Sequence, residues 1–408
     1  MSERILKSTV LKGNLKNISK LQKSAIVFSH GIGENALGIV RSLGRKNIPI
    51  ILFVIKGYKS VVAYSKYCNF ILELPDIKRE IILNEIIFVS QKYIEKPVLF
   101  FDNCHMVNIF HNDKELLKQY CHLTQDIGDF TDKTYQFDIA KKAMVAVPKT
   151  WKPETWIEFD DQIVSFNRLI AKPDFVSGIK PFKLIIANTA IDLKKQLKKY
   201  VSTPNGILIQ EYIEGTEESV WVSLGYRSNL SGKTYLMTAV KHMMNPIYGG
   251  VMAIGKVIDN VEVKNETLKL LNAFDYNGIF GFEFKLSAND NCYYYIEMSP
   301  RTEGFHNITT LAGIDLPTIA YNDLHKKPIE ISTKQTGLYW FNARYAIDSF
   351  IQSKSLRVFV KLIKFAFLAK EYQQFAWDDF NPFIKGTTWY LVGLIKNIIN
   401  KTIKLFYK

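Results

Sequence analysis

The pattern that most constrains the fold is the alternation of short apolar segments with helix-length stretches near the start of the chain. Residues 24–29, 49–54 and 97–101 are apolar runs of strand length, and a helical run ending at Gly44 follows the first of them. Strands separated by helical stretches of this length are typical of a parallel sheet covered by helices. We therefore expect an α/β domain in this part of the chain.

A glycine turn follows the first predicted strand. Gly31 and Gly33 leave that strand and open the helical run, a position where backbone N–H groups can bind phosphate. The dinucleotide-binding fingerprint requires a third glycine three residues later, and position 36 is Ala. We therefore interpret this segment as a structural strand-to-helix turn.

Composition and cysteine content narrow the class of protein. The 408 residues are 47% hydrophobic and 23% charged, which is typical of a globular protein rather than a disordered one. The four cysteines form no CxxC pair, so neither a zinc site nor a disulfide framework is predicted, and a reducing cytoplasm fits best. Residues 1–21 are polar and lysine-rich, unlike a signal peptide, and no apolar run reaches transmembrane length.

The net charge of +14 is concentrated at the two ends of the chain. Residues 1–24 carry six cations and one carboxylate, and residues 351–408 carry ten cations and three carboxylates. The middle of the chain is near neutral and lacks a basic stripe, and Lys outnumbers Arg in both ends. We therefore predict no nucleic-acid partner, because Arg is the better reader of bases. Solubilising tails are the simpler explanation of the charge.

The carboxyl-terminal segment has an amphipathic pattern. Lys354, Arg357, Lys361 and Lys364 follow one another at spacings of 3, 4 and 3, which places them on one helical face over an apolar remainder. Two interpretations remain open. Residues 354–408 lie on an anionic membrane surface, or their apolar faces pack on the protein core.

Two carboxylates in a predicted hairpin suggest a metal site. Glu283 and Glu297 lie on strands 281–286 and 293–298, which the turn at residues 288–291 connects. Two carboxylates that point to one face of a sheet suit magnesium, and Ser299 shares the direction of Glu297 because side chains in a strand alternate. Arg301 follows as a forked cation for a phosphoryl group. The alternative is two solvated carboxylates on a strand surface.

Residues upstream of the hairpin suggest a nucleotide site. Lys172 ends the predicted strand 168–172 just before a loop that contains Gly178, so it could reach a triphosphate under a flexible loop. Lys133 stands at the start of a predicted helix over 133–144. Residues 207–212 form another predicted strand that leads into a turn, a position where backbone groups can meet a purine. Glu217, just past that turn, could accept hydrogen bonds from ribose.

The order of these motifs resembles that of the ATP-grasp superfamily, most nearly its carboxylate–amine ligases such as D-alanine–D-alanine ligase and D-aspartate ligase-like proteins. The agreement in order and spacing covers about residues 25–330. The matching pieces are Asp132-Lys133, 140–143 with Val147-Pro148, 170–173 with the Gly178 loop, 209–217, 281–284 and 296–301.

The resemblance implies a role for each matching residue. Lys133, Lys172 and the Gly178 loop would bind ATP phosphates, Gln210, Glu211 and Ile213 would contact adenine, and Glu217 would contact ribose. Glu283, Glu297 and Ser299 would hold two Mg²⁺ ions, with Mn²⁺ as the alternative ion, and Arg301 would stabilise the transferred phosphoryl group. The family usually has Asn where this chain has Ser299, which is a weaker ligand.

The segment 241–250 and one histidine are further candidates. Similar ligases have a Gly-Gly segment near Gly249 and Gly250 that lines the substrate side of the cleft, where Lys241 could bind a carboxylate or phosphate. His306 is a second substrate-side candidate. A surface loop and a packed histidine are the alternatives.

The resemblance also implies the organisation and the reaction. We expect a basic arm (1–24), an α/β domain (25–125), a small ATP-grasp lobe (126–205), a larger α+β lobe with the metal site (206–330) and a basic helical extension (331–408).

The implied enzyme is a cytoplasmic ATP- and Mg²⁺-dependent ligase, which would lie at the inner face of the membrane if residues 354–408 bind lipid. It would join a small-molecule or glycan carboxylate to an amine or amino acid through an acyl phosphate, in surface-polysaccharide or cell-wall synthesis. An ATP-grasp carboxylase and a degenerate nucleotide-binding module with a membrane- or nucleic-acid-binding tail are the alternatives, and the oligomeric state stays open.

Overall fold

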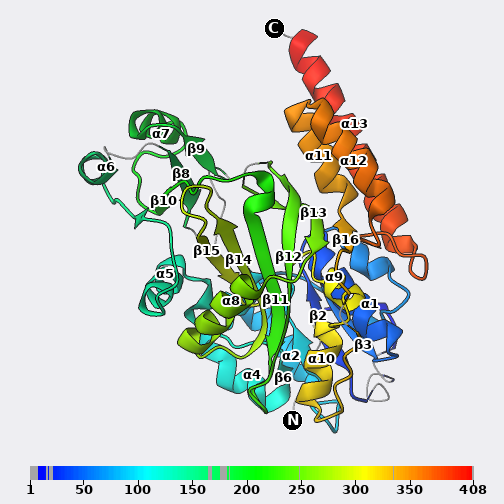
Figure 1. The fold of residues 1–408 in the computed structure, drawn as a ribbon. Helices are drawn as coiled ribbons and strands as arrows, with labels where there is room; N and C mark the ends of the chain where they lie inside the picture. Colours follow the sequence, from blue (N-terminus) through cyan, green and yellow to red (C-terminus); the bar gives the residue numbers. More distant parts are fainter. Residues whose placement is uncertain are drawn as a thin grey trace.

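The computed structural model describes residues 8–14, 17, 22–163, 168–174, 182, 184–247, 249–333 and 335–406, with no description of the side chains of residues 397, 398 and 401–406. These residues form three sheets, each covered by helices, and a group of helices at the carboxyl-terminal end (Figure 1). The α/β class predicted from the sequence is confirmed.

The first sheet has six strands in the order β1-β4-β3-β2-β5-β6. All neighbours are parallel except the edge pair β1–β4. The three strands predicted from apolar runs are β2, β3 and β5, whereas β1 falls in the segment predicted as a basic arm. The bounds are β1 (Thr9–Lys12), β2 (Ala25–Ser29), β3 (Ile50–Ile55), β4 (Phe70–Leu74), β5 (Val98–Phe100) and β6 (His122–Leu123).

Both faces of this sheet are buried, as its unbroken apolar strands require. Along β2, Ala25 and Val27 pack with α1 on one face, while Ile26 and Phe28 pack with α2 and α4 on the other. The helices of this domain are α1 (Glu34–Arg45), α2 (Arg79–Ser90), α3 (Cys104–Ile109) and α4 (Lys114–Tyr120).

The glycine turn before α1 has the structural role predicted for it. Gly31 and Gly33 have φ values of +63° and +76°, which favour glycine. A Cβ on Gly33 would lie 2.2 Å from the Ser29 Oγ and 2.7 Å from Val62. The turn therefore depends on glycine for both its backbone conformation and its packing.

The second sheet is small and antiparallel, in the order β7-β10-β8-β9. One side of it packs against α6 and α7. Because β10 pairs with β7 and β8, the predicted large lobe at 206–330 begins inside this smaller sheet. The bounds are β7 (Thr150–Trp151), α6 (Trp156–Ile163), β8 (Leu169–Pro173), β9 (Ile185–Ala187), α7 (Ala190–Leu197) and β10 (Ile207–Glu211).

The third sheet has seven strands in the order β15-β14-β11-β12-β13-β16-β17, antiparallel apart from the last pair. Its β14–β15 hairpin was predicted, whereas β12 and β13 were not, and β16 and β17 come from the segment predicted as a helical extension. The bounds are β11 (Val220–Arg227), β12 (Thr234–Asn245), β13 (Val251–Val257), β14 (Gly278–Leu286), β15 (Tyr293–Ser299), β16 (Tyr339–Phe341) and β17 (Glu371–Tyr372).

Helices pack on both faces of this large sheet. An aromatic cluster that includes Phe280, Phe282 and Tyr295 packs against α5 and α8. The other face shares a core with α1, α9 and α10, which joins the large sheet to the first domain. The bounds are α5 (Lys133–Lys142), α8 (Val261–Phe274), α9 (Asn307–Leu311) and α10 (Leu316–Leu324).

The C-terminal helices are α11 (Ala343–Ser353), α12 (Leu356–Leu368) and α13 (Asn381–Phe406). Helix α12 buries Val358 and Phe365 in a cluster with residues of β12, β13 and β16. The loop after β17 is tied to α1 by a buried ion pair in which Arg41 Nε lies 3.0 Å from Asp379 Oδ2. Within the described ranges, every helix is too short or too polar to cross a lipid bilayer.

Candidate functional site

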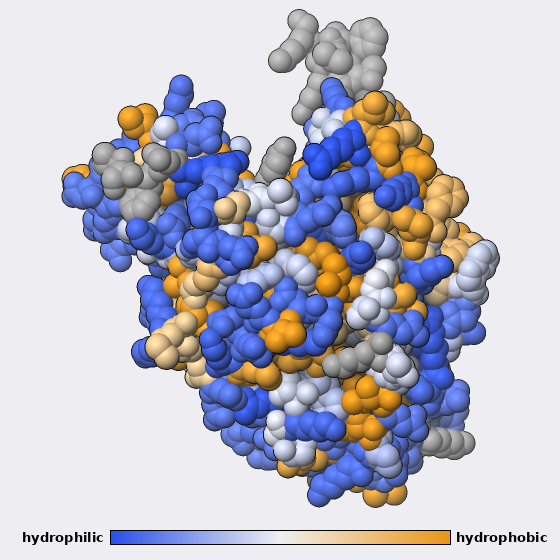
Figure 2. Space-filling model, viewed as in Figure 1, coloured by the Kyte–Doolittle hydropathy of each residue, from blue (hydrophilic) through white to orange (hydrophobic). Residues whose placement is uncertain are grey.

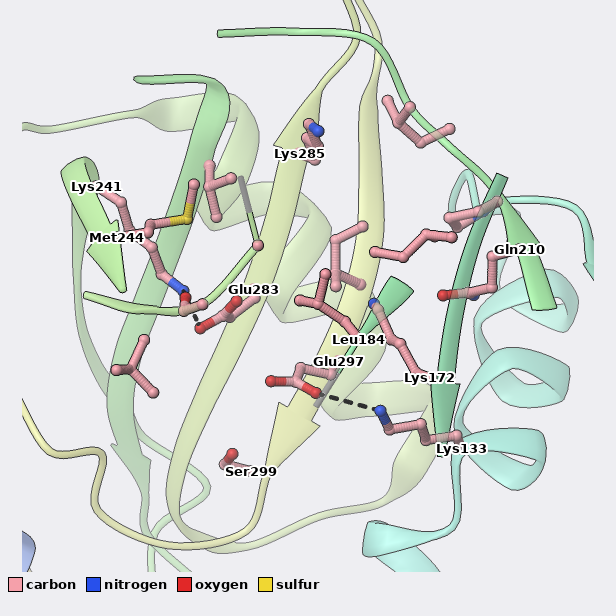
Figure 3. A pocket seen from close by; sticks show the side chains of 18 of the residues that line it. Lys133, Lys172, Leu184, Gln210, Lys241, Met244, Glu283, Lys285, Glu297 and Ser299 are labelled. Carbon is pink, nitrogen blue, oxygen red and sulfur yellow. Dashed lines mark hydrogen bonds and ion pairs between the residues drawn. The ribbon is translucent and has the colours of Figure 1, made fainter. Parts of the chain in front are cut away.

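A cavity of about 350 Å³ is lined by residues of the small sheet and of the large sheet. Strands β8 and β10 contribute from one side, and β12, β14 and β15 contribute from the other (Figure 3). The site residues predicted from the sequence that line it are Lys133, Lys172, Gln210, Glu211, Ile213, Lys241, Gly249, Gly250, Glu283, Glu297, Ser299 and Arg301.

The two predicted metal carboxylates are direct partners across the β14–β15 hairpin. Glu283 and Glu297 occupy opposite positions in the strand register, and Gly281 lies opposite Ser299. Opposite residues in an antiparallel pair share a face of the sheet. Both carboxylates therefore project into the same space, with Ser299 two residues further along the strand (Figure 3).

Glu283 is paired with a buried lysine. Lys241 Nζ lies 2.5 Å from Glu283 Oε1, and the lysine side chain is only 1% exposed. Burial raises the pKa of Glu283, and the neighbouring Glu297 adds to this rise while Lys241 opposes it. The carboxylate pair therefore favours additional positive charge in the cavity.

For Glu297, the neighbouring cations outweigh burial in their effect on the pKa. Burial acts to raise its pKa, but Lys133 and Lys172 together with the cations around them hold the pKa of Glu297 below its usual value. Lys133 Nζ lies 3.7 Å from Glu297 Oε2. Lys133 is held there by the start of α5, where the Asp132 side chain caps the helix by accepting a hydrogen bond from Tyr135 N. Glu297 therefore remains a charged carboxylate.

Two lysines with lowered pKa values face the cavity. Lys172 lies near the end of β8, and burial, reinforced by Lys133, lowers its pKa to about 8. Lys285 lies on β14, and burial lowers its pKa to about 8 as well. The sequence analysis did not predict Lys285 as a site residue. Side chains two residues apart in a strand lie on the same face, so Lys285 could have been predicted from its position relative to Glu283.

Arg301 is held at the edge of the cavity by a second acidic residue. Arg301 Nη1 lies 3.1 Å from Glu303 Oε2 and donates to Thr302 O at 2.7 Å. Burial acts to lower the pKa of Arg301, but Glu303 and Cys104 outweigh it, so the guanidinium stays charged. Its buried Nε has no hydrogen-bond partner within the described part of the chain, so it can bind a further acceptor.

One end of the cavity can hold a planar base. Gln210 Nε2 donates to Thr150 Oγ1 at 2.9 Å, and Glu211 Oε1 accepts from Lys149 N at 2.9 Å. Both side chains therefore bind β7 or the residue just before it. Glu211, Tyr212 and Ile213 follow one another along this end of the cavity. The apolar side chains that line the cavity include Pro148, Ile170, Leu184, Ile213, Val220 and Met244.

The segment 241–250 is a strand end and turn rather than a surface loop. Lys241 belongs to β12, and its Nζ also donates to Gly250 O at 3.2 Å. A Cβ on Gly250 would lie 2.1 Å from Asn245 O, so only glycine fits this turn. Gly249 and Gly250 line the cavity close to the carboxylate pair.

Three predicted site residues lie elsewhere or cannot be placed. Glu217 is not among the described residues that line the cavity, and its Oε2 lies 3.2 Å from Lys361 Nζ of α12. His306 is 1% exposed, packs against Gly38 of α1 and is not among the described residues that line the cavity, as its alternative role of a packed histidine would require. Burial lowers the pKa of His306 to about 4, so it stays neutral. Gly178 lies outside the described residues.

The residues present fit an oxygen-coordinated cation. No group of three or more His, Cys, Asp and Glu side chains that could hold a metal occurs among the described residues. The adjacent carboxylates of Glu283 and Glu297, with the Ser299 hydroxyl, offer the hard oxygen ligands that magnesium prefers, and magnesium often completes its shell with phosphate oxygens and water. Five cations line the same cavity, so a polyanion that carries its own metal ions suits it.

Comparison by sequence finds no matching family model and no matching curated protein. Solved structures do match. The N5-carboxyaminoimidazole synthetase from Staphylococcus aureus complexed with ADP aligns with a TM-score of 0.59 and 18% identity, over 80% of this chain and 83% of that one. The L-amino acid ligase from Bacillus licheniformis aligns with a TM-score of 0.56 and 13% identity, over 76% of each chain. These likenesses confirm the ATP-grasp fold that the motif order predicted.

Proposed function

We propose that this protein is an ATP- and Mg²⁺-dependent ligase that joins a carboxylate to an amine through an acyl phosphate. The observation that supports this most strongly is the cross-strand pair Glu283 and Glu297 in one cavity with Lys133 and Lys172. A structural or purely solvated carboxylate pair would not require five buried or half-buried cations in the same cavity.

In this proposal ATP spans the cavity. The adenine lies among the apolar side chains near Ile213, where the backbone after Glu211 provides donors and acceptors for its polar edge. Lys172 and Lys133 bind the phosphates, and Lys285, two residues from Glu283, adds a third cation. Burial lowers the pKa values of Lys172 and Lys285 to about 8, and a bound triphosphate would raise them again and so favour the charged lysines.

The proposed reaction has two steps. A carboxylate oxygen attacks the γ-phosphorus of ATP, the bond to the β-phosphate oxygen breaks, and ADP leaves. The amine nitrogen then attacks the acyl carbon, inorganic phosphate leaves, and the amine loses a proton. The protein aligns the reactants and offsets the repulsion between anions, and Arg301 lies where it can contact the transferred phosphoryl group.

Glu283, Glu297 and Ser299 would hold the magnesium. When bound, magnesium supplies charge neutralisation on the phosphate oxygens. Lys241 is already paired with Glu283, so it would either remain beside the metal or move to the substrate carboxylate. Ser299 offers one hydroxyl oxygen where similar ligases have Asn, so we expect weaker metal binding at this position.

A carboxylase is the second candidate, because several similar structures carry the name of a carboxyaminoimidazole synthetase. Such an enzyme would activate bicarbonate in the same ATP site. The cytoplasm is the compartment we propose for either activity. For the ligase, we propose a sugar acid and an amino acid or amino sugar as the substrate class, in surface-polysaccharide or cell-wall synthesis, which is supported by the motif resemblance and the C-terminal extension alone.

The test is ADP release by the purified protein with Mg²⁺ and a panel of amino acids crossed with a panel of sugar acids. Hydroxylamine added in place of the amine should trap the acyl phosphate as a hydroxamate of the activated acid. ADP release that depends on both an organic carboxylate and an amine supports the ligase. Release that depends on bicarbonate instead would support the carboxylase and contradict the ligase.

Two variants make the assay specific. Glu283→Gln should abolish carboxylate-dependent ADP release, since it removes a metal ligand. Glu115→Gln is the matched control, because this side chain is 79% exposed on α4 and pairs only with the neighbouring Lys118 among the described residues. Equal activity in both variants would contradict the assignment of the metal site.

A further inference from the structure

The C-terminal helices leave apolar side chains facing solvent on one side. On α12, these side chains follow one another at spacings of 3, 1, 3 and 4, which places them on a single helical face. They are Leu356, Phe359, Val360, Ile363 and Phe367, of which Leu356 is 76% exposed and Phe367 is 83% exposed.

Helix α13 repeats the pattern. Its exposed apolar residues also keep to one face, and two aromatic residues in the loop before it are exposed as well, including Trp377 at 87%. The residues are Ile384, Leu391, Val392, Ile395 and Ile399, with Trp377 and Phe380 in the loop. Figure 2 shows hydrophobic residues gathered over this group of helices. Together with the α12 residues, we call this set the apolar face.

The apolar face is distinct from the face that packs on the protein. Val358 and Phe365 occupy the opposite side of α12 and are buried against β13 and β16. Lys361 also lies on that inner side, where it contacts Glu217. Of the four cations predicted to share one helical face, Lys361 is therefore partly buried, whereas Lys354, Arg357 and Lys364 are exposed. The helices dock on the core, and a second apolar face remains uncovered.

The apolar face carries uncompensated positive charge along its borders. Four exposed cations lie on α12 and α13 and a fifth lies just after α12, and none forms an ion pair within the described part of the chain: Arg357, Lys364, Lys385 and Lys396, with Lys370 after α12. The three carboxylates of the same region are engaged by other residues. Asp379 and Asp378 bind arginines of α1, and Glu371 accepts a hydrogen bond from Asn307.

We propose that the apolar face docks this protein on an anionic membrane surface, with α12 and α13 lying in the plane of the interface. Exposed apolar patches of this extent mark interaction sites. Apolar side chains flanked by lysines and arginines are typical of helices that lie in the headgroup region of anionic bilayers. A second copy of the chain fits less well, because a two-fold contact would bring the same cations face to face. This proposal does not depend on the ligase activity.

The test is co-sedimentation of the full-length protein with vesicles of phosphatidylglycerol and phosphatidylcholine, compared with phosphatidylcholine alone. We expect binding to the anionic vesicles at low salt and release at high salt. The double variant Phe367→Glu, Ile395→Glu should lose at least about tenfold in vesicle affinity, and Lys364→Ala alone about fivefold. Ile94→Glu is the matched control, because Ile94 is 92% exposed and belongs to the first domain.

Two readouts decide between occupants. A blue shift of tryptophan fluorescence on addition of anionic vesicles, absent in Trp377→Phe, supports membrane contact. Full-length protein that stays in the supernatant with anionic vesicles at low salt overturns the proposal. A concentration-dependent dimer by sedimentation velocity that the double variant abolishes would overturn it in favour of a second copy. All substituted residues are exposed, and a thermal melt unchanged from wild type confirms that each variant is folded.

Discussion

The cavity between the small and large sheets buries charged side chains, whereas the C-terminal helices expose apolar ones, and both arrangements are unusual in a folded protein. In the cavity, cations are taken out of water, and Lys241 is almost fully buried against Glu283. On α12 and α13, residues as apolar as Phe367 and Ile395 face water. Buried charge and exposed apolar surface both cost free energy in the isolated protein. We have proposed a metal-bound triphosphate as the ligand of the cavity and an anionic lipid surface as the partner of the apolar face, and each would offset this cost.

The two regions also touch. Lys361, on the inner side of α12, forms ion pairs with Glu217, the carboxylate predicted to bind ribose, and with Glu218. It also donates to His242 O at 3.2 Å, and His242 is the residue that follows Lys241 in β12. Helix α12 therefore contacts the strand that carries Lys241, without any of its described residues lining the cavity.

The largest expected effect is on turnover. Glu297→Gln removes a charge that would hold magnesium at the transferred phosphoryl group, so we expect a loss of about 3 kcal/mol or more in transition-state stabilisation, roughly a hundredfold or greater. Single-turnover measurement of ADP release checks this. Near wild-type rates would contradict the assignment of the cavity as the ATP site. They would not bear on the proposed membrane contact of the apolar face.

The next effect is on stability, at the anchor between the C-terminal helices and the first domain. Asp379 accepts hydrogen bonds from Arg41 Nε, Ser65 Oγ and Lys66 N, and both side chains of the ion pair are nearly inaccessible. Asp379→Ala leaves Arg41 buried without its partner, so we expect a loss of about 3–5 kcal/mol in the free energy of unfolding. Urea denaturation checks this. A change below about 1 kcal/mol would mean that the anchor is dispensable.

A third prediction uses pH to separate ligand binding from folding. Lys172 has a pKa of about 8 in the folded protein, below its usual value near 10.5. Between pH 8 and 9.5 the folded state loses this proton before the unfolded state does, so the stability of the free protein should rise with pH. Over the same range the affinity for an ATP analogue should fall, because a neutral lysine attracts phosphate less.

Calorimetry and chemical denaturation at several pH values check these opposite slopes. Lys172→Met should make both slopes shallower, with Lys285 responsible for the remainder. Parallel slopes in stability and affinity would contradict a phosphate-binding role for Lys172.

The smallest expected effect concerns the contact between the two regions. Lys361→Ala removes a half-buried ion pair with Glu217, so we expect ATP affinity to fall by about 1 kcal/mol or less. The loss should shrink for 2′,3′-dideoxy-ATP, which lacks the hydroxyl groups that Glu217 would bind. An equal loss for both nucleotides would indicate that Lys361 acts through the fold rather than through the ribose contact.

The sequence predicted the elements whose pattern is local. Strands β2, β3 and β5 are unbroken apolar runs, and the carboxylates of the β14–β15 hairpin fall into register because a short turn connects their strands. Most of the predicted site residues could be grouped around one cavity because their motifs follow one another in the order known from similar ligases.

The elements that the sequence did not predict depend on long-range contacts. Strand β12 contains Lys241 and His242, which interrupt its apolar pattern because each pairs with a carboxylate from another part of the fold. Strand β16 follows a polar segment and is fixed by pairing with β13. Which side of α12 meets the core was also undetermined, because both sides are apolar and only the packed structure shows that Val358 and Phe365 face inward.

The magnesium dependence of nucleotide binding tests the proposed ATP site directly. Calorimetric titration of the wild-type protein with a non-hydrolysable ATP analogue, with Mg²⁺ and then with EDTA, should show binding that weakens at least about tenfold when the metal is removed. The double variant Glu283→Gln, Glu297→Gln should bind the analogue with an affinity that no longer responds to Mg²⁺. Wild-type protein that fails to bind the analogue, or a double variant that keeps the full magnesium response, would contradict the account.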